Sequence, residues 1–212
     1  MNDVLALYRN AASIPARMFL RGRVLLSDLE FVERYVPRTG TIVDLGCGHG
    51  LFANLMALRS PERNVIGIDL SPEKIEHAQA TVQGRRNIEF RCGDMLDLAL
   101  PECDAITIID VLYLLPASGQ EKMLRACRKI LKPGGILVWK AQERRPRWKY
   151  AWTYAQEMIT TSAGITRGKR GNLTFMSREE ALAAMSGAGF RPRIIEMKSF
   201  RPYSDVLYLG DS

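Results

Sequence analysis

The segment TIVDLGCGHG, residues 41–50, decides the fold of this 212-residue chain. Its β-branched and apolar first half predicts a buried strand over 41–45, and an apolar helix follows the glycines. Gly46, Gly48 and Gly50 permit a tight turn and let the backbone approach a ligand with no Cβ in the way. The free N–H groups at the start of the following helix suit an anionic group. The segment therefore predicts a strand–turn–helix unit that binds a ligand.

The alternation of β-branched runs with helical segments continues along the chain. Further strands are expected at 64–70, 88–91, 104–110, 135–140, 193–199 and 204–210. Helices are expected over 50–59, from Ser71 onward, over 118–131 and over 177–190. This rhythm favours a parallel sheet covered by helices. We therefore expect an α/β, Rossmann-like, doubly wound sheet of about seven strands, mostly parallel with an antiparallel C-terminal strand.

An acid precedes the glycine turn and narrows the class of ligand. Dehydrogenases use the spacing GxGxxG to seat a pyrophosphate. Here the spacing is GxGxG, and Asp44 lies two residues before the first glycine. A carboxylate in that place would repel a pyrophosphate, whereas it would attract a ligand that carries an ammonium group. The residues therefore favour an amino-acid-like ligand over a dinucleotide.

Composition restricts the compartment and the partners. The chain has 47% hydrophobic residues, four cysteines and two histidines, spaced for neither a zinc site nor a disulfide framework. We expect reduced thiols, a cytoplasmic location, and no metal, spanning helix or secretory signal. The net charge is +7, and after residue 140 there are 12 Lys+Arg against 7 Asp+Glu. This surplus is compatible with an anionic acceptor, an anionic membrane face, nucleic acid or simple solubility.

Four motifs then follow one another in a recognisable order. They are VDLGCGHG at 43–50, Asp69 at the end of the second strand, GDMLDL at 93–98 and LKPGGILV at 131–138. With this series the sequence resembles the class I S-adenosylmethionine-dependent methyltransferases, in particular the small-molecule enzymes of ubiquinone and menaquinone biosynthesis. The resemblance extends over residues 38–140 and implies S-adenosylmethionine as the cofactor.

The resemblance also implies a role for each motif. Asp44 would anchor the amino group of the cofactor, Asp69 would accept from the ribose hydroxyls, and Asp94 would accept from the adenine amine while Met95 packs on the ring. The cofactor-binding residues implied are Asp44, Gly46, Cys47, Gly48, Gly50, Asp69, Leu70, Asp94, Met95 and Asp110. Without the resemblance, Asp69 could equally be a helix-capping acid and Met95 a core residue.

The acceptor side is expected after the fourth strand, in IIDVLYLLP at 108–116. By resemblance Asp110 and Tyr113 are the candidate catalytic residues. Tyr113 and Leu114 stand where many quinone-biosynthesis relatives carry an acid or a histidine, so the obvious general base is missing. Methyl transfer depends chiefly on positioning and water exclusion, and it needs no strict catalytic triad.

We expect a single domain, because 212 residues suit one core. Its expected parts are an N-terminal helical cap (1–37), a cofactor-binding core (38–140), an acceptor-side insertion (141–176), and the last helix and strands (177–212). The cap should hold one or two helices, interrupted at Gly22. The insertion gathers arginines and aromatics within 140–156, which form either an acceptor lid or an amphipathic helix packed on the sheet.

The expected function is transfer of a methyl group from S-adenosylmethionine to a small-molecule or lipid-precursor acceptor, anionic or aromatic. An RNA methyltransferase and a non-catalytic cofactor-binding protein are the alternatives; nucleic acid is not favoured, since no appended RNA-binding module is recognisable. Arg17, Arg21 and Arg23 alternate with apolar residues near the N-terminus. That segment either caps the cofactor or makes weak peripheral contact with a membrane.

Overall fold

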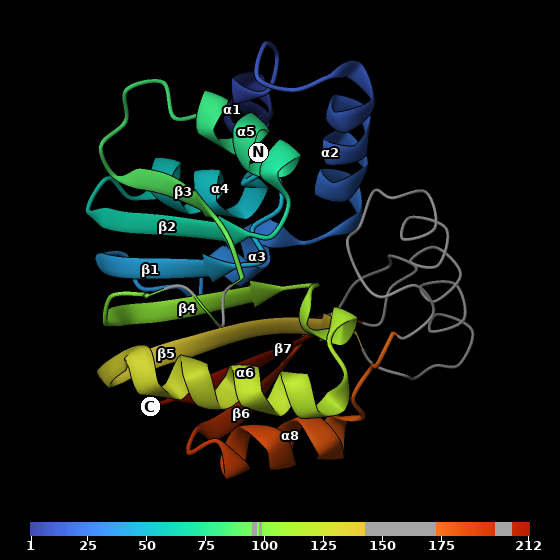
Figure 1. The fold of residues 1–212 in the computed structure, drawn as a ribbon, viewed down its shortest axis with the longest axis vertical. Helices are drawn as coiled ribbons and strands as arrows, with labels where there is room; N and C mark the ends of the chain where they lie inside the picture. Colours follow the sequence, from blue (N-terminus) through green and yellow to red (C-terminus); the bar gives the residue numbers. More distant parts are fainter. Residues whose placement is uncertain (95–96, 98, 143–172, 198–204) are drawn as a thin grey trace. The chain divides into compact units, whose positions relative to one another are not determined.

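The computed structural model describes residues 1–94, 97, 99–142, 173–197 and 205–212 (Figure 1). Its strands are β1 (Gly40–Leu45), β2 (Arg63–Asp69), β3 (Ile88–Cys92), β4 (Cys103–Ile109), β5 (Leu131–Gln142), β6 (Arg191–Glu196) and β7 (Asp205–Asp211). They form one sheet in the order β3-β2-β1-β4-β5-β7-β6. β1, β2 and β3 pair in parallel, and β7 runs antiparallel to both β5 and β6. The predicted α/β sheet with an antiparallel C-terminal end is confirmed.

The described helices comprise three that precede β1 and others, including one 3-10 turn, that lie between the strands. They are α1 (Asn2–Leu7), α2 (Ile14–Leu26), α3 (Leu29–Glu33), α4 (Leu51–Arg59), α5 (Pro72–Ala80), η1 (Leu112–Leu114), α6 (Ala117–Ile130) and α8 (Arg178–Gly187). The last of these begins with the capping box formed by Ser177 and Glu180.

Two local predictions differ from the structure. The N-terminal segment forms three helices instead of one or two, and Gly22 lies inside α2 without ending it. The fifth strand begins at Leu131 instead of 135, directly after α6. Gly134 adopts a left-handed φ of 77° within that strand, so the turn expected from Pro133-Gly134-Gly135 is absorbed into β5.

The chain divides into two compact units, residues 1–107 and 108–212. In the first, α4 packs against β2 and β3, and α5 packs against the same two strands. The core strand β1 is buried from Ile42 onward. In the second unit, α6 packs against β5 and α8, and α8 packs against β6.

A buried ion pair fixes the start of β2 in the first unit. The guanidinium of Arg63 is inaccessible to solvent and lies 2.6 Å from Oε1 of the equally buried Glu33. Its remaining N–H groups donate to the carbonyl oxygens of Pro37, Val36 and Met56 at 2.6, 2.9 and 2.9 Å. Arg63 thereby holds α3, the segment that follows it and the end of α4 around one cation.

We expect Arg63→Ala to lower the free energy of unfolding by about 3–5 kcal/mol, because it leaves the buried Glu33 carboxylate with only the longer contact from the exposed Arg38 at 3.5 Å. Chemical denaturation measures this loss. Arg91→Ala is the matched control: it breaks the exposed pair between Arg91 and Glu89, and the change should stay below about 1 kcal/mol. Equal effects of the two variants would contradict the structural role of Arg63.

Candidate functional site

The glycine loop joins β1 to α4 in the first unit. Gly46, Gly48 and Gly50 have left-handed φ values of 73°, 57° and 79°. The N–H groups of Gly46 and Cys47 donate to the carbonyl of Ile68 at 2.8 and 2.9 Å, which ties the loop to the end of β2. Side chains other than glycine rarely adopt this backbone conformation, so the turn depends on the glycines.

Two of these glycines have opposite surroundings. A Cβ at Gly50 would lie 2.6 Å from the Phe90 ring, so this glycine permits close packing of the loop on β3. A Cβ at Gly48 would meet no atom of the described residues within 4 Å. Gly48 is therefore where an external group can approach the backbone.

Asp44 lies at the carboxyl end of β1, directly before the loop, and is only 1% exposed. Its Oδ1 accepts a hydrogen bond from the Thr107 hydroxyl at 2.6 Å. Among the described residues, its Oδ2 has no hydrogen-bond partner. Burial raises the pKa of Asp44 to about 7; the Thr107 hydrogen bond opposes this rise and the charge of Asp69 adds to it. A buried carboxylate oxygen of this kind suits a cationic donor, so the residues present fit the ammonium group of an amino-acid-like ligand.

Asp69 ends β2 and contacts the same loop. Its Oδ2 accepts from the N–H of Gly48 at 2.9 Å, and its Oδ1 accepts from the N–H of Ser71 at 2.9 Å. Asp69 therefore orders both the glycine loop and the residue that precedes α5. Leu70, which follows it, is 46% exposed.

The remaining predicted cofactor residues of this unit are Cys47 and the segment after β3. Burial raises the pKa of the Cys47 thiol, which stays protonated and contacts the carbonyl of Gly48 at 3.7 Å. Asp94 is half-buried, and its carbonyl accepts from the N–H of Asp97 at 3.0 Å. Met95 lies outside the described residues. Because β1, β2 and β3 are parallel, Asp44 and Asp69 at the carboxyl ends of their strands and Asp94 just after β3 lie toward one edge of the sheet.

A buried polar network that the sequence did not suggest supports the glycine loop. The Tyr8 hydroxyl donates to the carbonyl of His49 at 2.8 Å. The side-chain amide of Asn54 donates to the Tyr8 hydroxyl at 3.0 Å, to the Gly50 carbonyl at 2.9 Å and to the Thr81 hydroxyl at 2.9 Å. The sequence offered a signal for Asn54, because it is the one polar residue at the otherwise apolar start of α4. No such signal pointed to Tyr8, which follows α1.

The two histidines of the chain also meet at this loop. The rings of His49 and His77 stack with centroids 5.2 Å apart, and their Nδ1 atoms are 3.1 Å apart. One ring must donate and the other accept, which requires that they are not both protonated. The pKa of His49 is lowered to about 4, chiefly by burial and in addition by the positive charges of Lys74, His77 and Arg23.

In the second unit, Asp110 follows β4 with a left-handed φ of 54°. Its Oδ1 and Oδ2 accept from the buried ammonium of Lys140 at 2.7 and 2.9 Å, and Lys140 lies 3.0 Å from Asp205. Burial alone would lower the pKa of Lys140, but the charges of Asp110 and Asp205 prevail and raise it. Sequence reasoning missed Lys140 and Asp205, because a lysine inside a strand ordinarily points to solvent.

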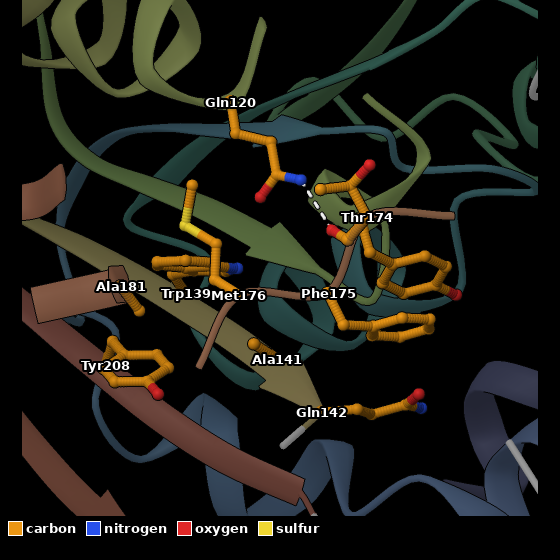
Figure 2. A pocket seen from close by; sticks show the side chains of 10 residues that line it. Gln120, Trp139, Ala141, Gln142, Thr174, Phe175, Met176, Ala181 and Tyr208 are labelled. Atoms are coloured by element: carbon orange, nitrogen blue, oxygen red, sulfur yellow. Dashed lines mark hydrogen bonds between the residues drawn. The ribbon is translucent and has the colours of Figure 1, made fainter. Parts of the chain in front are cut away.

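Tyr113 lies in η1 of the same unit and stacks on Phe175 with ring centroids 4.6 Å apart. Both rings line a small cavity with Trp139 and Tyr208 (Figure 2). The Gln120 amide closes it by donating to the Thr174 carbonyl at 2.6 Å. The cavity volume is about 10 Å³, which accommodates about one water molecule.

Residues 42–135 match the family described as a methyltransferase domain. The chain is 28% identical over 188 residues to the ubiquinone biosynthesis O-methyltransferase of Chromobacterium violaceum, across 86% of this chain and 78% of that protein. Human N-acetylserotonin methyltransferase in complex with SAM matches with a TM-score of 0.69 at 20% identity, over 87% of this chain and 51% of that one. A SAM-dependent methyltransferase from Aquifex aeolicus gives 0.66 at 20% identity, over 89% and 92%.

A left-handed glycine loop beside a buried acid, on a sheet with an antiparallel C-terminal strand, gives the Rossmann-like fold of the solved methyltransferase structures. Together, the match over residues 42–135, the relatives and the fold support a class I S-adenosylmethionine-dependent methyltransferase. The predictions of family, enzyme class and cofactor are thus confirmed. The role of each individual residue stays a prediction. The arginines and aromatics expected to line the acceptor lie within 143–172, outside the described residues.

We expect the affinity for S-adenosylhomocysteine, which also carries an ammonium group, to rise with pH and to level off above about 7. The ammonium needs an ionised Asp44, and burial keeps this acid partly protonated below that pH. Calorimetry from pH 5.5 to about 8.5 checks this. Asp44→Asn should bind about 10- to 100-fold more weakly and lose the pH dependence. Thr107→Val should shift the midpoint of this pH dependence upward, since it removes the hydrogen bond that lowers the pKa of Asp44. An unmoved midpoint would contradict the role of Asp44 in binding the ammonium group.

His49 should make the fold sensitive to acid. Its folded-state pKa of about 4 lies below the unfolded value of 6.5, so its contribution is complete above 6.5 and is lost as pH falls toward 4. The loss is at most about 3 kcal/mol. Asp44, whose folded-state pKa is raised, acts in the opposite direction over the same range.

The wild-type stability profile therefore hides both effects, and only variants separate them. In His49→Gln the unfolding free energy should decline with rising pH between about 4 and 6.5 more steeply than in the wild type. In Asp44→Asn it should instead climb over that interval. Proton NMR of the two histidines gives an independent reading, and a His49 resonance that titrates near 6.5 would refute the assignment.

Proposed function

We propose that the protein transfers a methyl group from S-adenosylmethionine to a ring hydroxyl of a lipid-soluble aromatic precursor. The observation that carries the transfer itself is the unpartnered, buried Oδ2 of Asp44 beside the open face of Gly48. The acceptor class is supported by the likeness to a ubiquinone biosynthesis O-methyltransferase, which extends over 86% of this chain.

Three groups of the first unit would hold the cofactor. Asp44 would accept from its ammonium group, the backbone at Gly48 would face its methionine part, and Asp69 has lone pairs left to accept from its ribose hydroxyls. The bound cofactor supplies a methyl group already activated on a sulfonium. The protein therefore contributes orientation and exclusion of water more than chemical activation.

On the acceptor side, Asp110 and Tyr113 are proposed to act as positioning groups. A carboxylate that accepts twice from a buried ammonium is a weak base, so Asp110 is suited to orient a donor and not to remove its proton. Tyr113 is held by its stacking on Phe175. The hydroxyl proton of the acceptor would then leave to water, which a phenol with a pKa near 10 permits more readily than an aliphatic alcohol.

A lipid-soluble acceptor also gives a reason for weak peripheral membrane contact of a cytoplasmic enzyme. Among the described residues, no helix has the length and apolarity needed to cross a bilayer. Any contact through these residues would therefore involve surface helices, of which α2 carries the most exposed apolar side chains.

The test of the proposed function uses S-adenosylmethionine labelled on its methyl group. The enzyme is incubated separately with a membrane-lipid extract, with water-soluble catechols and with total RNA, and the labelled product is identified by mass spectrometry. We expect an alkali-stable methyl ether in the lipid extract and slower labelling of the catechols. Label in RNA would indicate an RNA methyltransferase. Intact cofactor binding with no label in any fraction would indicate a non-catalytic protein.

Asp69→Ala should weaken binding of S-adenosylhomocysteine by about 1.5–3 kcal/mol, the loss expected when hydrogen bonds to a charged group disappear. Glu62→Ala is the matched control, because it removes an exposed acid at the opposite end of β2. The control should bind like the wild type. Unchanged calorimetric affinity in Asp69→Ala would remove this residue from the ribose site.

A further inference from the structure

The first unit contains a second cavity, which adjoins the glycine loop through Tyr8 and is not used by the proposed chemistry. It lies between α1 and α2, the two dark-blue helices of Figure 1, and has a volume of about 640 Å³. It is lined by Asn2, Leu5, Ala6, Tyr8, Arg9, Arg17, Leu20 and Arg21. That volume is within the range of small-molecule sites.

The cavity combines cationic and apolar walls. Arg9, Arg17 and Arg21 line it, and none of its lining residues is acidic. Nη1 of Arg17 donates to the Arg9 carbonyl at 2.7 Å, which holds these two residues together. Within the described part of the chain, no carboxylate lies within ion-pair distance of these three side chains. Three arginines without an acid form a strong site for a phosphate group.

The outer surface of α2 continues this site with apolar side chains. Ile14, Met18 and Leu25 are 66%, 66% and 73% exposed. Their spacing of four and seven residues places them on one face of the helix, and Arg21 projects beside them. Large apolar groups next to cations on one helical face are typical of helices that lie in a membrane interface.

We propose that this cavity binds the phosphate headgroup of an anionic phospholipid, while Ile14, Met18 and Leu25 enter the bilayer surface. The phosphate lies among Arg9, Arg17 and Arg21, and Leu5 and Ala6 receive the first carbons of the lipid. The inference gives the membrane contact proposed above a defined site, and it is independent of the identity of the methyl acceptor.

The experiment is co-sedimentation of the full chain with vesicles of equal parts phosphatidylglycerol and phosphatidylcholine, compared with pure phosphatidylcholine. We expect pelleting only with the anionic vesicles, reduced by salt. Each arginine near the surface contributes about fivefold to partitioning, so Arg17→Gln with Arg21→Gln should lower it about 25-fold. Ile14→Ser with Met18→Ser should lower it as well, without changing its dependence on salt. Arg86→Gln with Arg125→Gln is the matched control for net charge and should pellet like the wild type.

Calorimetry with inorganic phosphate and with soluble dioctanoyl phosphatidylglycerol separates the two sources of a phosphate. Tight binding of inorganic phosphate without pelleting would overturn the lipid assignment in favour of a free anion. If Arg86→Gln with Arg125→Gln lowered pelleting as much as the α2 pair, net charge alone would explain the binding, and the proposed site would be wrong. Sedimentation velocity tests for a dimer. If the wild type did not pellet but formed a dimer that Ile14→Ser with Met18→Ser abolished, the apolar face would bind a second copy of the chain. Affinity for S-adenosylhomocysteine should be unchanged in all variants; its loss in the arginine pair, with no pelleting of the wild type, would make α2 a cofactor cap instead.

Discussion

Left-handed backbone at three alternate glycines is the constraint on which the first unit depends. It turns the chain from the end of β1 into α4 within five residues, and it does so beside a buried carboxylate. Every contact described around this turn then serves to hold it. Ile68 binds it from β2, Asp69 binds it from the same strand, and Tyr8 binds it from the position directly after α1. Distant parts of the sequence are thereby assembled around one loop.

The protein uses two different arrangements for its buried charges. Arg63 and Glu33 form a closed pair whose hydrogen bonds are satisfied within the protein, so its role is structural. Asp44 has one satisfied oxygen and one that is open, so its burial is compensated only in part. An incompletely satisfied buried acid costs stability, which is reasonable where a ligand completes the arrangement. The satisfied acid, Glu33, therefore has a structural role, whereas the open oxygen of Asp44 suits a ligand.

Much of this was predictable from the sequence, for identifiable reasons. The glycine spacing, Asp44 and the β-branched runs are local signals, and they specify strand, turn and helix with errors of only a few residues. The supports of the site are not local. Tyr8 is 41 residues from its partner His49, and Asp110 is 30 residues from Lys140. No spacing rule connects such pairs, so only the folded chain brings them together. The start of β5 was misplaced because Pro133-Gly134-Gly135 has the composition of a turn, while the strand tolerates Gly134 at positive φ.

The buried contact of Lys140 with Asp110 and Asp205 has a consequence for how this enzyme diverges. The three buried side chains share one space, with the Lys140 ammonium 2.7 Å from Asp110 and 3.0 Å from Asp205. Replacing Lys140 by a neutral residue would leave two buried carboxyl groups without their shared cation, and replacing either acid would remove one of the two groups that hold this cation. An evolutionary path that changes acceptor chemistry at Asp110 must therefore alter β5 and β7 as well. Across descendants of this sequence the three positions are expected to be inherited as one character, although they are distributed over a hundred residues of chain.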